Sequence, residues 1–133
     1  MIESAEHAIQ VIENKNLPEH ERVHAIKYLR GAPSKEAVSA LLIALKDDDH
    51  GVRFAASESL ADMGDIVMPQ LLQALSGPAN DIRLREGALR VFHNSSSERV
   101  REESRELSRV LLGVGAQPLS MKAASELLAH WKP

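Results

Sequence analysis

Three arginines recur along the chain at almost constant spacing. Arg22, Arg53 and Arg85 lie 31 and 32 residues apart, each near the start of an expected helix. A guanidinium presents a planar fork of donors that matches a carboxylate or a phosphate. The series could therefore bind anions, or it could tie the carboxylates and carbonyls of one turn to the next part of the chain.

The densest group of carboxylates lies in the stretch Asp47-Asp48-Asp49-His50. Carboxylate oxygens in one loop are ligands for a hard cation. The stretch lacks the glycine-punctuated Asp-x-Asp-x-Asp pattern and the distal glutamate of a calcium loop. Asp49 is also required as a helix N-cap. We expect no metal site here.

No other residues form a recognisable catalytic set. The six histidines are dispersed over different helices and turns, and the chain has no cysteine. Disulfides, thiolate ligands and a cysteine nucleophile are thereby excluded. Neither a G-x-S-x-G nucleophile motif nor a phosphate-binding glycine loop is present. We expect no catalytic residue and no cofactor.

Composition limits the partners. The 133 residues carry a net charge of −3, with 44% hydrophobic and 3% aromatic residues. Nucleic acid and anionic membranes are therefore poor default partners. No stretch is apolar enough to span a membrane, and the N-terminal residues have no basic region typical of a signal peptide. We expect a single cytoplasmic domain.

Apolar periodicity predicts two helices around the acidic turn, folded against each other. Their apolar faces consist of Val38, Leu41, Leu42 and Leu45, and of Val52, Ala56, Leu60 and Met63. Asp49 is placed to cap the second helix, and Gly64 to end it. So short a pair cannot bury its apolar face alone and needs similar neighbours.

Related patterns predict an all-α, short right-handed solenoid of about four antiparallel helix pairs within one domain, 1–133. The pairs are expected at 3–31, 34–64, 65–95 and 97–132. Asp65 should cap the helix that contains Pro69, and Asp81 the one that follows. Residues 97–112 should form one continuous helix. Pro118 should open a closing second helix, sealed by Trp131.

The central pair resembles a HEAT repeat, of the short kind named after phycobilisome lyase subunits. The matching residues are Ala37 to Leu45, Asp47, Val52-Arg53, Ala55-Ala56, Leu60 and Gly64. The resemblance implies a HEAT/armadillo-like superhelix and a structural role for the recurring arginines. That family includes scaffolds, lyase subunits and a hydroxylase.

The metal-dependent chemistry of the hydroxylase branch does not carry over to this sequence. That branch has His-Glu dipeptides directly after the repeat arginine. In this chain those places hold Val23-His24, Phe54-Ala55 and Glu86-Gly87.

The resemblance also implies that the second helices line the concave face. On that face we expect a mixed-charge ridge formed by Val23, Lys27, Arg30, Phe54, Glu58, Glu86, Arg90, His93, Lys122 and Glu126. An exposed Phe54 would be a natural anchor for a partner. The alternative is an ordinary solvated helix face.

The sequence therefore favours a non-enzymatic scaffold that binds another protein through this ridge. The alternative is an accessory or lyase-like subunit that handles a tetrapyrrole (bilin) chromophore, as the resemblance suggests. Binding to nucleic acid is less favoured, because the chain has few aromatic side chains and a negative net charge.

Overall fold

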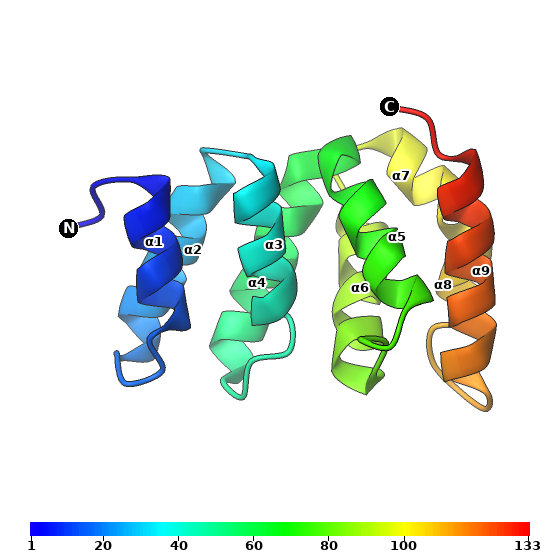
Figure 1. Cartoon of the computed structure of the whole chain (residues 1–133), viewed down its shortest axis with the longest axis horizontal. Coiled ribbons are helices and arrows are strands. Elements are labelled where there is room, and N and C mark those ends of the chain that lie inside the picture. The colour runs from blue at the N-terminus through cyan, green and yellow to red at the C-terminus, as the bar shows by residue number, and fades with distance from the viewer.

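The computed structural model describes residues 1–133 and contains helices, turns and loops but no strand. The helices are α1 (Ala5–Glu13), α2 (Glu19–Arg30), α3 (Lys35–Ala44), α4 (His50–Met63), the 3-10 helix η1 (Gly64–Val67), α5 (Met68–Ser76), α6 (Ile82–Asn94), α7 (Glu98–Glu103), α8 (Arg105–Arg109) and α9 (Ala116–His130). They form an elongated stack with the N-terminus at one end (Figure 1). The fold is an α-solenoid.

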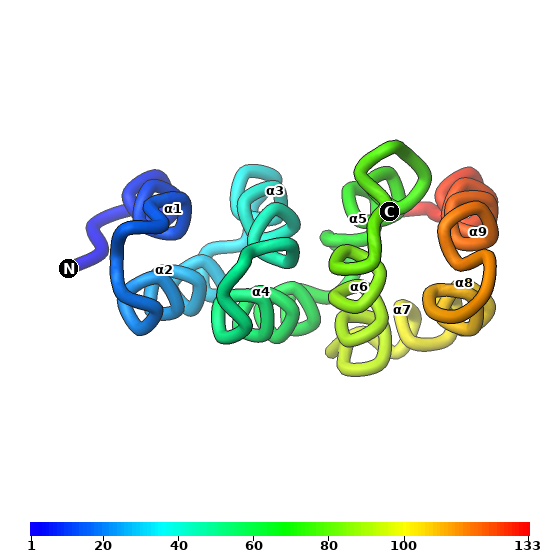
Figure 2. Tube along the Cα trace, turned by 90° about the horizontal axis from the view of Figure 1, so that it is seen from below, coloured from blue at the N-terminus to red at the C-terminus, as the bar shows by residue number.

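The stack has two layers, which Figure 2 shows edge-on. One layer holds α1, α3, α5 and α9, and the other holds α2, α4, α6, α7 and α8. The second layer packs continuously, with α4 between α2 and α6, while α3 has fewer contacts with α1 and α5. A single hydrophobic core of 29 buried residues runs between the layers.

The chain's own polar residues set where several helices begin. Asp49 accepts hydrogen bonds from the N–H groups of Gly51 (2.9 Å) and Val52 (3.3 Å) at the start of α4. Asp81 accepts one from the Leu84 N–H (2.9 Å) at the start of α6. At the end of α4, Gly64 has φ +69°, which glycine adopts at little cost. These three predicted caps are confirmed.

The predicted apolar stripes face the core. Leu41, Leu45, Val52 and Leu60 are all fully buried. Because α-helices repeat every 3.6 residues, side chains at these spacings necessarily share one face. The core is built mainly from aliphatic residues, with Phe92 as its one fully buried aromatic side chain.

Asp65 does not cap the next helix, contrary to the prediction. Gly64 to Val67 form η1, and α5 begins at Met68 with Pro69 in its first turn. The Asp65 carboxylate instead accepts a hydrogen bond from the Ser97 hydroxyl and pairs with Arg99 at 3.5 Å. The Asp65 carboxylate therefore contacts residues that follow α6 and does not cap α5.

The single helix predicted over 97–112 is also wrong, because the chain bends at Ser104. That residue is buried with ψ 1°, and it separates α7 from α8. The bend lets α7 pack on η1 and α6 while α8 packs on α6 and α9. Val100, Leu107 and Leu111 are buried and join this part of the chain to the core.

The last part of the chain reverses the order of the layers. α7 and α8 follow α6 within the same layer, so the chain returns to the first layer only with α9 (Figures 1 and 2). α9 packs extensively on α5. The closing helix is therefore not a second helix, and Lys122 and Glu126 do not belong to the predicted ridge.

Candidate functional site

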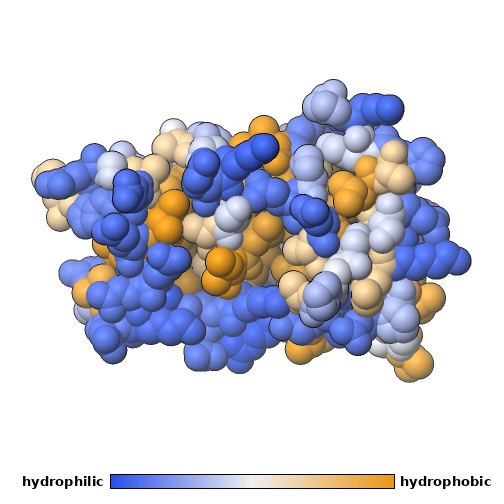
Figure 3. All heavy atoms as spheres, in the orientation of Figure 1, coloured by the Kyte–Doolittle hydropathy of each residue, from blue (hydrophilic) through white to orange (hydrophobic).

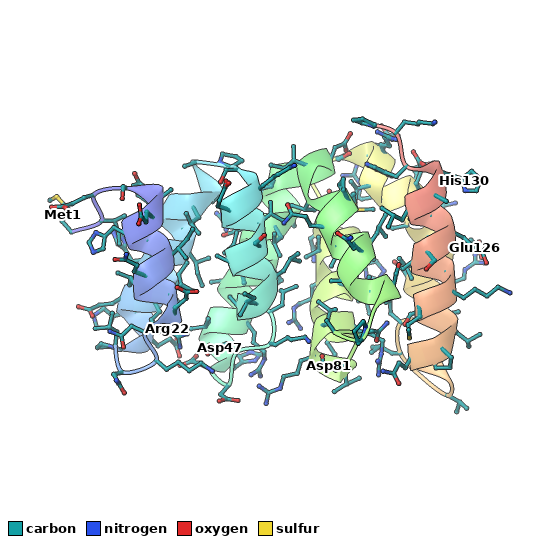
Figure 4. The ribbon with its side chains drawn as sticks, viewed as in Figure 1. Met1, Arg22, Asp47, Asp81, Glu126 and His130 are labelled. Carbon is teal, nitrogen blue, oxygen red and sulfur yellow. The ribbon has the colours of Figure 1, made fainter.

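The most buried ion pair in the molecule joins the first helix pair to the second. Arg22 donates through Nη1 and Nη2 to the two carboxylate oxygens of Asp47, at 3.1 and 2.7 Å. Its Nε and Nη2 also donate to the Ile12 carbonyl, at 2.9 and 2.6 Å. Arg22 is 5% exposed and Asp47 6%. Figure 4 shows the two residues near each other at the lower edge of the molecule. This arginine bridges two repeats, which is the structural role that the resemblance implies.

Opposing effects act on the Asp47 carboxylate. Burial favours its neutral form, but hydrogen bonds from Arg22 and from the Asp49 N–H favour the charged form. The second effect prevails, and the pKa of Asp47 lies below its usual value. Asp47 is thus a charged structural residue whose two oxygens already have partners.

The other two arginines of the series make different contacts. Arg53 donates to the carbonyls of Asp47 (2.7 Å) and Asp48 (3.1 Å) in its own turn. Arg85 donates to the Asn80 side chain (2.7 Å) and to the Leu111 carbonyl (3.0 Å). All three arginines therefore stabilise turns between helices through hydrogen bonds, but only Arg22 also forms a buried ion pair.

Arg83 joins the third helix pair to the second, a role that the sequence analysis did not assign. It donates to the Asp47 carbonyl at 2.8 Å and pairs with Asp48 at 3.4 Å. In the sequence, the indication of this role was the position of Arg83, two residues before the recurring Arg85.

The acidic turn is occupied by these structural contacts. Asp48 lies between Lys15 (4.0 Å) and Arg83, and its side chain is 89% exposed. Asp49 caps α4 and lies beside Glu19, and a hydrogen bond between the two carboxyls raises the pKa of Glu19 and lowers that of Asp49. No three His, Asp or Glu side chains are grouped so that they could hold a metal ion.

Four of the ten residues predicted for the ridge line one surface depression of about 270 Å³. Three successive helices of the second layer line it: Arg30 from α2, Phe54 and Glu58 from α4, and Arg90 from α6. Ser57, Ala61, Asp62 and Asn94 complete the lining and were not among the predicted residues. We call this depression the α4–α6 groove.

Phe54 is the large apolar side chain of the α4–α6 groove. It is 46% exposed, and its ring stacks on His50 with 6.4 Å between the ring centroids. The Phe54 carbonyl accepts a hydrogen bond from the Ser57 hydroxyl (2.8 Å), which in turn accepts one from Arg90 Nε (3.3 Å). The buried Ser57 therefore holds Arg90 at the groove, and no carboxylate pairs with this arginine.

A second depression of about 390 Å³ lies on the other side of α6. It is lined by Leu89 and His93 of α6, by Arg101 of α7, and by Arg105, Ser108 and Arg109 of α8. None of these lining residues is acidic. We call it the basic groove. Among the predicted ridge residues, only His93 belongs to it.

The remaining predicted residues lie elsewhere. Val23 is partly buried and packs against the core, while Lys27 and Glu86 are exposed outside both grooves. Lys122 and Glu126 are exposed on α9, and Figure 4 shows Glu126 in the layer of α1, α3 and α5. The ridge is therefore shorter than predicted and is continued by arginines of α7 and α8.

Two other surface features were missed. Leu42, Ile43 and Ala74 line a groove between α3 and α5, on the face where Figure 3 shows hydrophobic atoms at the surface. His7, His20 and His24 line one depression at the N-terminal end with Met1 and Ile2. The expected dispersal of the histidines is wrong there. His20 and His24 lie one helical turn apart, which the sequence spacing could have indicated.

Comparison with known proteins supports the repeat interpretation. A family model described as HEAT repeats matches residues 5–92, which extend from the start of α1 almost to the end of α6. The match ends close to where the order of the layers reverses. Searches of curated proteins and of solved structures found no match. No helix combines the length and the apolar character needed to cross a membrane. The chain belongs to the HEAT-repeat family.

Proposed function

We propose that this protein is a non-enzymatic scaffold that binds another protein through the outer surface of its second layer. HEAT repeats generally mediate protein–protein interaction. The observation that carries the proposal is the position of Phe54, half exposed in a groove lined by α2, α4 and α6. Aromatic side chains in such positions often contribute most of the energy of a protein interface.

Polar groups around Phe54 suit a protein partner. Arg30 pairs with Asp62 at 3.2 Å on the rim, while Glu58 and Arg90 have no oppositely charged partner within 4 Å. An apolar centre with a polar rim is typical of interfaces. Rim charges of this kind mainly govern the rate of encounter.

The test compares Phe54→Ser with Ile43→Ser. Ile43 is an even more exposed apolar residue, at 68%, but it lies on α3 in the opposite layer. Immobilised parent and variants would be incubated with extract of the source cells, and the captured proteins identified by mass spectrometry. Both variants should melt within a few degrees of the parent.

A protein captured by the parent and by Ile43→Ser but lost with Phe54→Ser supports the proposal. Loss with Ile43→Ser alone would move the binding surface to the α3–α5 side. If Phe54→Ser unfolds the protein, Phe54 is structural and the α4–α6 groove loses its centre.

The resemblance over residues 37–64 also leaves the bilin-handling subunit as an alternative. Adding biliverdin to the purified protein distinguishes the two. A shift of its visible absorbance that saturates at one equivalent would favour the chromophore function. An unchanged spectrum would leave the scaffold proposal as the better one.

A further inference from the structure

The outer surface of the second layer has an uneven charge. Its α4–α6 groove contains both signs, with Arg30 and Arg90 balanced by Glu58 and Asp62. The basic groove beyond α6 is lined by three arginines and His93, without a carboxylate. Since the whole chain has a net charge of −3, this concentration of positive charge is local.

Two of these arginines have no acidic partner. Neither Arg90 nor Arg101 pairs with a carboxylate within 4 Å; Arg101 donates to the Ser95 carbonyl and Arg90 to Ser57. Arg105 and Arg109 do pair, with Glu102 (3.9 Å) and Glu106 (3.1 Å). Those two pairs have side chains at least 61% exposed, so water screens them and a ligand displaces them at little cost.

The two grooves lie next to each other, because α6 lines both of them. Phe54 lies on α4, Arg90 and His93 on α6, and Arg105 on α8, in the order in which these helices pack. Packed helices are about 10 Å apart, and an extended peptide advances about 3.3 Å per residue. A chain that crosses the helices would therefore meet Arg90 about three residues after Phe54, and Arg101 and Arg105 about six residues after it.

Interspersed carboxylates argue against a nucleic acid on this surface. Glu58 and Asp62 line the α4–α6 groove, and they would repel a continuous phosphate backbone. A peptide avoids this repulsion because its charges are separate and can be placed opposite the arginines alone.

We propose that the surface binds an extended acidic segment of the partner protein. An apolar side chain of that segment packs on Phe54, and carboxylates about three and about six residues further along pair with Arg90 and with the basic groove. This inference rests on the proposed function and specifies the chemistry of the partner. Arginine is well suited to this role because its guanidinium binds a carboxylate through two parallel hydrogen bonds.

The experiment selects ligands from a phage-displayed library of random twelve-residue peptides on the folded, full-length protein. Synthetic copies of the enriched peptides are then titrated by fluorescence polarisation against the parent, Phe54→Ser, Arg90→Glu and Arg101→Glu. Lys122→Glu is the matched control, because it makes the same change in net charge on α9 in the other layer. Circular dichroism and melting curves establish that every variant is folded.

We expect enriched peptides to carry an apolar residue followed by acidic residues at about three and six positions. Each arginine reversal should weaken their binding about tenfold, whereas Lys122→Glu should change it less than twofold. Raising the salt concentration should weaken binding to the parent, because the contacts are charged.

Peptides that need Phe54 but have no acidic bias, and that bind equally well to Arg90→Glu and Arg101→Glu, would overturn this inference while supporting the proposed function. Enriched peptides indifferent to Phe54→Ser would overturn both.

Discussion

Removing the carboxylate of Asp47 tests how the first two repeats are held together. Asp47→Ala would leave the Arg22 guanidinium buried with the Ile12 carbonyl as its one remaining acceptor, and it would also remove the acceptor of the Asp49 N–H (2.9 Å). Breaking a buried ion pair by removing one partner costs about 3–5 kcal/mol. We expect a loss of that size in the free energy of unfolding.

The loss translates into a large shift in melting temperature. Unfolding entropy is about 2.1 cal/mol/K per residue, so 1 kcal/mol corresponds to roughly 3–4 °C in a chain of this length. Asp47→Ala should therefore melt roughly 10–18 °C below the parent in a circular dichroism scan at pH 7. Asp48→Ala is the matched control. Its side chain is 89% exposed and its ion pairs are at the surface, so it should lower the melting temperature by a few degrees at most.

The pH dependence of the difference gives a second readout. The pKa of Asp47 is lower in the folded state than in the unfolded state. The ion pair therefore stabilises the fold at pH values above the unfolded-state pKa, and this stabilisation is lost as the pH falls through the folded-state pKa. The difference in melting temperature between the parent and Asp47→Ala should be constant from pH 5 to 8 and should become smaller below about pH 4. If Asp47→Ala melted within about 2 °C of the parent at pH 7, the buried pair would contribute no net stability and the reasoning would fail.

Three further predictions concern single elements. Leu60→Ala should cost about 2–5 kcal/mol in chemical denaturation, because Leu60 is fully buried in the central pair; a cost below 1 kcal/mol would contradict its place in the core. Asp81→Ala should cost about 1 kcal/mol through the lost cap of α6, and clearly more than Asp48→Ala measured in the same way. Gly64→Ala should cost about 1 kcal/mol or more because φ is +69° there; an unchanged melting temperature would show that the turn relaxes.

The helices themselves could be predicted, since they depend on local features. Val38, Leu41 and Leu45 recur at helical spacing and are buried. This spacing predicts a buried helix face without any knowledge of the neighbouring helices. Asp49 and Asp81 cap their helices through hydrogen bonds that span only two or three residues. Interactions of this range are encoded in the order of the residues, so the sequence was sufficient for them.

The candidate site was only partly predictable. Arg30, Phe54, Glu58 and Arg90 come together because α2, α4 and α6 keep the regular repeat arrangement. The arginines of α7 and α8 were not among the residues predicted for the ridge. Which of those charges face α6 depends on the bend at Ser104, and no local pattern predicts that bend.

The sequence by itself determined the helices, most of their ends and membership of a repeat family, because each depends on periodicity and on contacts a few residues long. Only the tertiary structure decided to which layer each helix belongs. Asn80 directly precedes Asp81, the N-cap of α6, and its amide donates to the Leu75 carbonyl (2.8 Å) and to the Ser120 hydroxyl of α9 (2.9 Å). A carboxylate could not donate these bonds, which help to fix α9 against α5. This placement depends on contacts between residues 40 apart in the sequence. An apolar stripe predicts that a helix has a buried face, but it does not indicate in which layer the helix lies.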